Sequence, residues 1–223
     1  MNRTLKHLVG MLVGVVGLST LASPARAETL VELWAEPSVA WSPIKAATLE
    51  FEQKLAFGTA PFQVVEVSPD FSFSYDVTKW LTPGVGYRHI ERRDKNDAFE
   101  SWNRLYADVS VAPELGKFIL DYRLRLQTQI PTDASRKTRK AVRNRLQAGY
   151  KVTKSLEPYV GVETSTRVGG SNGTQWKQMR WAVGADFSLK PHRFGLFGYL
   201  DQEQVDVNDP SVVILGASYR YKF

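Results

Sequence analysis

The sequence predicts an all-β fold: an antiparallel up-and-down transmembrane β-barrel of about ten strands, with twelve as the alternative, and a polar, charged interior. Three observations predict it. Apolar and polar residues alternate along several runs that are longer than ordinary strands. The connections between these runs are alternately long and short. The chain also ends on an aromatic, strand-like segment whose last residue is Phe223.

The alternation is clearest in two neighbouring runs, 118–130 and 141–152. Successive side chains of a strand point to opposite faces, so each run has one apolar and one strongly charged face. In the first run Leu120, Tyr122, Leu124, Leu126 and Ile130 alternate with Asp121, Arg123, Arg125, Gln127 and Gln129. In the second run Val142, Leu146, Ala148, Tyr150 and Val152 alternate with Arg143, Arg145, Gln147 and Lys151.

Residues 1–27 have the pattern of a secretory signal peptide: a basic start, an apolar run from Leu8 to Leu21, and an Ala25-Arg26-Ala27 cleavage site. The apolar run is shorter than the ~20 residues that a membrane-spanning helix needs. The leader holds three of the 29 basic residues and no acid, so 26 basic residues face 23 acidic ones in the mature chain. The overall basicity therefore does not indicate nucleic-acid binding. Without cysteine, an exported chain has no disulfides to support it.

Residues 28–43 are expected to form a periplasmic lead-in, because Pro37 and Pro43 interrupt a strand-like stretch; one short extra strand is the alternative. Residues 44–223 are expected to form the outer-membrane β-barrel. Its ten strands are expected at 44–57, 71–77, 83–93, 99–111, 118–130, 141–152, 158–167, 176–189, 193–203 and 213–223.

The connections sort into two classes along the chain. The long ones are 58–69, 92–98, 131–140, 168–175 and 204–210, and the short ones are 78–82, 112–116, 153–157 and 190–192. Outer-membrane barrels have an even number of strands, short periplasmic turns and longer outer loops. With the amino terminus in the periplasm, every long connection falls outside and every short one inside.

Energetics decides which face of each strand meets lipid. An arginine on the lipid face near the midplane costs about 2–4 kcal/mol. Turning Arg123, Arg125, Arg143 and Arg145 outward would together cost on the order of 10 kcal/mol, most of the stability of a typical protein. The charged faces are therefore expected to point inward. A soluble periplasmic lipocalin-like barrel, with the faces reversed, is the alternative.

Several segments resemble an uncharacterised family of short Gram-negative outer-membrane β-barrel proteins, a domain of unknown function. They are Leu33-Trp34, the stretch from Glu50 to Lys54, the stretch from Gly84 to His89, the stretch from Arg143 to Leu146, and Pro158-Tyr159 with Glu163. The resemblance covers most of the mature chain and implies a barrel in the cell outer membrane, with no known ligand or reaction. The terminal Phe223 also resembles the signal that the barrel-assembly machinery reads. The expected partners are therefore this machinery, outer-membrane lipid and lipopolysaccharide.

The candidate functional residues are the inward-facing charges. They form an expected lumen charge cluster of Arg104, Asp108, Asp121, Arg123, Arg125, Arg143, Arg145, Glu163, Arg180 and Asp186. Pairing about the loop centre would place Arg123 opposite Arg145 and Arg125 opposite Arg143, with Glu163 near Arg145 or Gln147. The main interpretation is a lumen plugged by arginine–carboxylate pairs. Ten strands lie between eight-stranded barrels, which side chains can fill, and sixteen-stranded porins, which hold a channel, and this favours the plug. The alternative is a narrow, porin-like pore that prefers anions.

An outer-membrane enzyme is a further alternative, although no enzymatic activity is the main expectation. His89, with Glu91, is the only plausible general base, and no serine nucleophile motif accompanies it. The sequence contains no metal-ligand cluster and no phosphate-cradling glycine loop, so no metal or cofactor is expected. A basic run from Ser135 to Lys140 in a long outer loop is expected to be solvated, with contact to lipopolysaccharide phosphates as the alternative.

Overall fold

The computed structural model describes residues 30–94, 97–169, 173–203 and 211–223, and this part of the chain is all β. The expected signal peptide, 1–27, lies outside the described residues. No helix in the described residues is long and apolar enough to cross a membrane. The strands are β1 (Leu30–Ile44), β2 (Ala47–Thr59), β3 (Phe62–Tyr75), β4 (Leu81–Arg93), β5 (Phe99–Val111), β6 (Glu114–Leu115), β7 (Phe118–Pro131), β8 (Arg139–Tyr150), β9 (Leu156–Val168), β10 (Gln175–Leu189), β11 (His192–Glu203) and β12 (Val212–Lys222).

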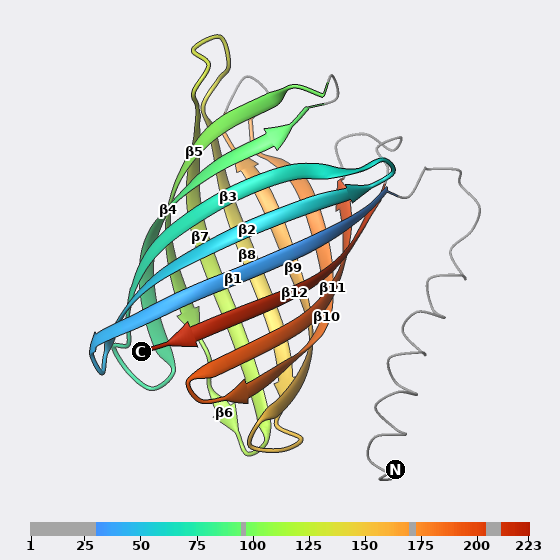
Figure 1. Cartoon of the computed structure of the whole chain (residues 1–223). Helices are drawn as coiled ribbons and strands as arrows, with labels where there is room; N and C mark the ends of the chain where they lie inside the picture. The colour runs from blue at the N-terminus through green and yellow to red at the C-terminus, as the bar shows by residue number, and fades with distance from the viewer. Residues whose placement is uncertain (1–29, 95–96, 170–172, 204–210) are drawn as a thin grey trace.

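The strands close into a barrel in chain order, which confirms the predicted architecture (Figure 1). Eleven strands form the wall, and the two-residue β6 pairs only with the start of β7. Neighbours along the chain pair antiparallel, and β5 pairs directly with β7. The ring closes between β1 and β12, which run parallel from Leu30 opposite Val212 to Ala40 opposite Lys222. An odd number of alternating strands makes the first and last run the same way, so the closing pair departs from the even, fully antiparallel barrel expected.

The eleventh wall strand is β1, in the segment where a lead-in was the main expectation. Residues 30–44 pair with both neighbours, so the extra-strand alternative is correct and the strand is long. Pro37 was the reason for doubt, and its effect is local. Pairing of β1 with β2 is interrupted between Ala35 and Ser38 and then resumes. A proline cannot donate a ladder hydrogen bond, but the flanking residues keep the strand in place.

The connection expected at 58–69 was also wrong. β2 runs to Thr59 and β3 begins at Phe62, so Ala60 and the cis-peptide-linked Pro61 make a tight turn. Residues 64–67 extend β3, as their valines had suggested. The connection at 132–138 lies at one end of the barrel, here named the long-loop end. The turns at 45–46, 76–80, 151–155 and 190–191 lie at the other, the short-turn end.

The two faces of the wall have opposite chemistry, as the alternation predicted. Large apolar side chains point outward and are exposed on every wall strand, with Val160 at 59% and Leu196 at 68%. Charged side chains point inward and are buried, with Asp70 at 4% and Glu163 at 8%. A water-soluble domain shows the reverse distribution.

Three inward glycines make room for aromatic rings on the neighbouring strand. Gly86 lies opposite Tyr106, Gly184 opposite Tyr159, and Gly216 opposite Phe197. A methyl group at any of these glycines would overlap the ring beside it. Each ring therefore lies flat along the inner wall, where it fills part of the lumen between the charged side chains.

Candidate functional site in the barrel lumen

All ten residues expected in the lumen charge cluster face the interior, and most of them lie in a few ion-paired groups. The densest group lies on β7, β8 and β9 around Glu163. This carboxylate accepts hydrogen bonds from Arg143 on the adjacent strand and from Arg123 on β7, the latter at 3.1 Å between Nη2 and Oε2. Arg145, whose Cα lies opposite Glu163, pairs instead with Asp121 at 3.3 Å. The predicted register, Arg123 opposite Arg145 and Arg125 opposite Arg143, is confirmed.

In two further ion pairs, the arginine donates two hydrogen bonds to one aspartate, from Nε and from Nη2. Arg125 donates from Nε and Nη2 to Oδ2 of Asp108, at 3.0 and 2.5 Å, and its guanidinium lies over the ring of Tyr106. Arg180 donates to both carboxylate oxygens of Asp201, at 2.8 and 2.5 Å. Such bidentate pairs fix side-chain geometry as well as charge.

The last two expected members lie apart from this network. Asp186 pairs with Arg193 at 2.8 Å near the short-turn end. Arg104 has no carboxylate within ion-pair distance among the described residues. With the amide oxygen of Gln129 turned toward it, Arg104 donates to that oxygen at 2.6 Å from Nη2.

The opposite wall carries a second charged group that the sequence reasoning largely missed. Lys54 pairs with Glu66 at 3.0 Å and lies over the ring of Trp34. Arg88 joins Asp70 at 2.6 Å and Glu52 at 3.1 Å. Glu66 and Asp70 were overlooked because their segment was interpreted mainly as a loop. The signal was present, since they share the polar parity of Ser72 and Ser74 on the same strand.

Three cavities lined by the described residues follow one another inside the barrel. The central cavity, about 440 Å³, is lined by both charged groups, with nine basic and eight acidic side chains. A cavity of about 290 Å³ lies toward the short-turn end and contains Asp121, Glu157, Asp186 and Arg193. The third, about 350 Å³, lies at the long-loop end. Arg104 and Arg143 line both the third and the central cavity.

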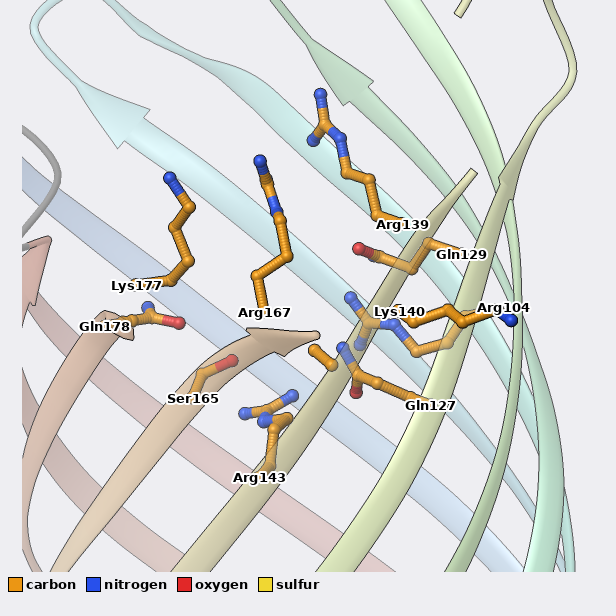
Figure 2. A pocket seen from close by; sticks show the side chains of 11 residues that line it. Arg104, Gln127, Gln129, Arg139, Lys140, Arg143, Ser165, Arg167, Lys177 and Gln178 are labelled. Atoms are coloured by element: carbon orange, nitrogen blue, oxygen red, sulfur yellow. The ribbon is translucent and has the colours of Figure 1, made fainter. Parts of the chain in front are cut away.

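The long-loop cavity differs in its charge (Figure 2). We name it the basic vestibule; its basic lining residues are Arg104, Arg139, Lys140, Arg143, Arg167 and Lys177. The other lining side chains are neutral, and no carboxylate is among them. Figure 2 shows the lining residues on β5, β7, β8, β9 and β10. Lys140 shares the outward parity of Val142, and its side chain points away from the cavity.

The loop above the vestibule, 132–138, is held by its own contacts. Asp133 accepts a hydrogen bond from the backbone amide of Ser135 at 2.9 Å, which lowers the pKa of the Asp133 carboxyl. Arg136 pairs with Glu100 at the end of β5, and this contact raises the pKa of the guanidinium. Part of the basic run expected to be solvated is therefore tied to the rim.

His89 belongs to a polar cluster on the outer face of β4 and β5. Its Nδ1 lies 3.0 Å from Oδ1 of Asn103 and its Nε2 lies 2.9 Å from Oε1 of Glu91. Ser101, which the sequence analysis did not connect with this histidine, donates to the same Glu91 oxygen at 2.7 Å. The serine hydroxyl thus bonds to the carboxylate and not to the imidazole. In the part of the chain described, no three His, Cys, Asp or Glu side chains are grouped so that they could hold a metal ion.

These features define a class: a closed β-barrel with an apolar outer face and an ion-paired interior. Residues 46–211 match the model of a family described as "Protein of unknown function (DUF2490)". The chain therefore belongs to the DUF2490 family. A search of the curated proteins found no match.

Proposed function

We propose that this protein is an outer-membrane barrel with its apolar face against lipid. The observation that carries the proposal is the inverted distribution of side chains, apolar outside and charged inside. An exposed apolar surface that continues around a closed wall is far larger than the patches of a few hundred Å² that soluble monomers tolerate. The closed wall also leaves no open sheet edge among the described strands, as a bilayer requires.

The carboxyl end fits an assembly signal. Phe223 is exposed at the short-turn end, and its backbone amide donates to the carbonyl of Ala40 at 2.9 Å, across the seam. We propose that the barrel-assembly machinery reads this terminal strand, after export directed by residues 1–27, and that outer-membrane lipid and lipopolysaccharide surround the wall.

Location is tested on the mature protein by fractionation and by gel migration. We expect it in the outer-membrane fraction, soluble only with detergent, and migrating faster unheated than boiled because a closed barrel resists unfolding by detergent. A monomer that stays in solution in plain buffer would refute the membrane location and leave the barrel itself intact.

We further propose that the lumen is a structural plug. The charged groups on the two walls meet around the central cavity, and Arg104 and Arg143 stand between this cavity and the vestibule. The ion pairs of Glu66, Asp70, Asp108 and Asp201 are buried and hydrogen-bonded, which resists displacement by solutes. Planar-bilayer recordings are expected to show no conductance steps.

A narrow anion-preferring pore is the second candidate, and the carboxylate-free vestibule is the observation that favours it. If recordings do show steps, chloride is expected to carry the current. Replacing Arg143 with Gln should then reduce the preference for anions, whereas Lys154→Gln in a short turn should leave it unchanged.

Catalysis is not part of this proposal, because Ser101 is engaged by Glu91 instead of His89. Phospholipid and peptide hydrolysis by the purified protein should be at the background rate, and His89→Ala should not change it. A rate above background that disappears in His89→Ala, but not in His192→Ala, would establish a rim enzyme.

A further inference from the structure

The basic vestibule differs from the rest of the lumen in its charge balance. Basic and acidic side chains nearly balance around the central cavity, whereas the vestibule gathers five basic side chains and no carboxylate, since Lys140 points outward. Like charges held close together in a partly enclosed space repel one another strongly. Most arginines deeper in the lumen pair with a carboxylate, whereas several arginines of the vestibule do not.

The contacts of the individual side chains support this contrast. Arg104, Arg139 and Arg167 have no carboxylate within ion-pair distance in the described part of the chain. Arg139 lies instead over the ring of Trp102, with its guanidinium carbon 4.3 Å from the ring centroid. Nε of Arg143 is buried and has no hydrogen-bond partner. Arg139 and Arg143 are thus held in place, and at least one donor position is left over.

A neutral residue in the same part of the wall, Gln127, also supports a ligand site. Gln127 is buried to about nine-tenths, and its Oε1 has no partner. Since the two ends of an amide are interchangeable within this geometry, Gln127 can present either a donor or an acceptor to a ligand. An unsatisfied buried polar atom is uncommon in proteins and marks a place where a bound group completes the hydrogen bonding.

We propose that the basic vestibule is a binding site for a phosphate group. Guanidinium forks match the tetrahedral oxygens of phosphate and hold them through paired, charge-assisted hydrogen bonds. The volume of about 350 Å³ is at the lower end of the range for small-ligand sites. A further cavity lined by Arg136, Lys137 and Arg167 continues outward from it between the loops.

Two sources carry this chemistry: a small soluble phosphoester, and the phosphorylated glycolipid of the outer leaflet. Both would reach the vestibule from the long-loop end, where its lining residues lie. The binding itself depends only on the vestibule and not on where the barrel resides. Its failure would leave the proposed membrane location standing, and the reverse also holds.

The test uses the full mature chain in zwitterionic detergent micelles, with inorganic pyrophosphate as the probe in calorimetric titration. We expect saturable binding that weakens as salt is added. In the variant with Arg104→Gln and Arg167→Gln we expect about 100-fold weaker binding, tenfold for each lost charge-assisted contact. The matched control, Lys154→Gln with Lys190→Gln, removes two exposed charges at the short-turn end and should change the affinity by less than about twofold.

A second pair of variants keeps the charge and removes the fork. Arg104→Lys with Arg167→Lys should bind about tenfold more weakly than the wild type. This variant decides the question if the glutamine variant does not fold, as judged by its unheated gel migration. Lipopolysaccharide and the same lipopolysaccharide stripped of its phosphates are titrated in parallel. Binding of pyrophosphate supports a soluble ligand, and binding of intact lipopolysaccharide alone supports a lipid-borne one.

Two results would overturn the proposal. One is the absence of saturable binding by pyrophosphate and by intact lipopolysaccharide. The other is equal weakening in the vestibule variant and in the short-turn control, because that would show a general charge effect instead of a site.

Discussion

Arg123 on β7 reaches across the whole width of β8 to Glu163 on β9, where its Nη2 lies 3.1 Å from Oε2. The same carboxylate receives Arg143 from the intervening strand, so three strands are joined through one buried group. A carboxylate shared in this way neutralises charges that would otherwise repel each other across the β7–β8 ladder.

Replacing Glu163 with Gln should destabilise the barrel by about 3–5 kcal/mol, because two buried arginines lose their counter-charge. The measurement is the free energy of unfolding in urea with the barrel in detergent. The matched control is Glu114→Gln, whose carboxylate pairs with Lys151 at 2.7 Å in an exposed position. The control should lose less than about 1 kcal/mol. Equal losses of unfolding free energy in the two variants would show that Glu163 stabilises the barrel no more than an exposed ion pair does.

The substitution Leu126→Arg tests whether the outer face of the barrel meets lipid or water. Leu126 lies outward in the middle of β7, between Ala107 and Val142, and is 55% exposed. In lipid bilayers the substitution should cost about 2–4 kcal/mol, whereas Leu115→Arg in the short-turn connection should cost about 0–1 kcal/mol. On a water-facing surface both changes should be within about 0.5 kcal/mol. Unfolding titrations in vesicles provide the measurement.

The substitution Gly86→Ala tests how closely the Tyr106 ring packs against the inner face of the wall. The added methyl would overlap the tyrosine ring, and that ring's hydroxyl donates to Asp70 at 2.6 Å. We expect a loss of about 1–3 kcal/mol, as for other overpacked interiors. Gly198→Ala is the control, because its methyl would meet only ordinary contacts of 3.7 Å or more. The double variant Gly86→Ala with Tyr106→Ala should lose less free energy of unfolding than the two single variants together. If its loss is no less than their sum, overlap with the tyrosine ring is not the cause of the Gly86→Ala destabilisation.

The Lys54–Glu66 pair should show strong coupling in a double-mutant cycle. Both side chains are nearly buried, so Lys54→Met or Glu66→Gln alone leaves a charge without its partner and should cost about 3–5 kcal/mol. The double variant should cost clearly less than the two single losses together. Strict additivity would mean that the two groups are solvated independently in the folded barrel.

Much of the architecture follows from the period of the sequence. Alternation over 118–130 and 141–152 was enough to predict the register of Arg123 against Arg145, because pairing about a loop fixes every pair beyond it. Local signals failed at prolines. Pro37 interrupts a ladder without ending β1, and Pro61 lies in a turn that made the start of β3 look like a loop.

Ion-pair partners were less predictable than strand positions. The Cα of Glu163 lies opposite Arg145, yet the carboxylate pairs with Arg143 and Arg123. Arginine side chains are long enough to reach diagonal neighbours, and Arg145 has Asp121 within reach. Contacts that skip a strand, such as Arg88 on β4 with Glu52 on β2, depend on the curvature of the wall, which no local pattern encodes.

The parallel seam between β1 and β12 has a topographic consequence. Leu30 begins its strand beside Val212, and Phe223 ends the chain beside Ala40. An epitope tag joined just ahead of Leu30 and one joined after Phe223 would thus be displayed on opposite sides of a bilayer. In a barrel with an even strand count both tags would face the same compartment. On intact cells, antibodies should accordingly stain one of the two tagged proteins and not the other.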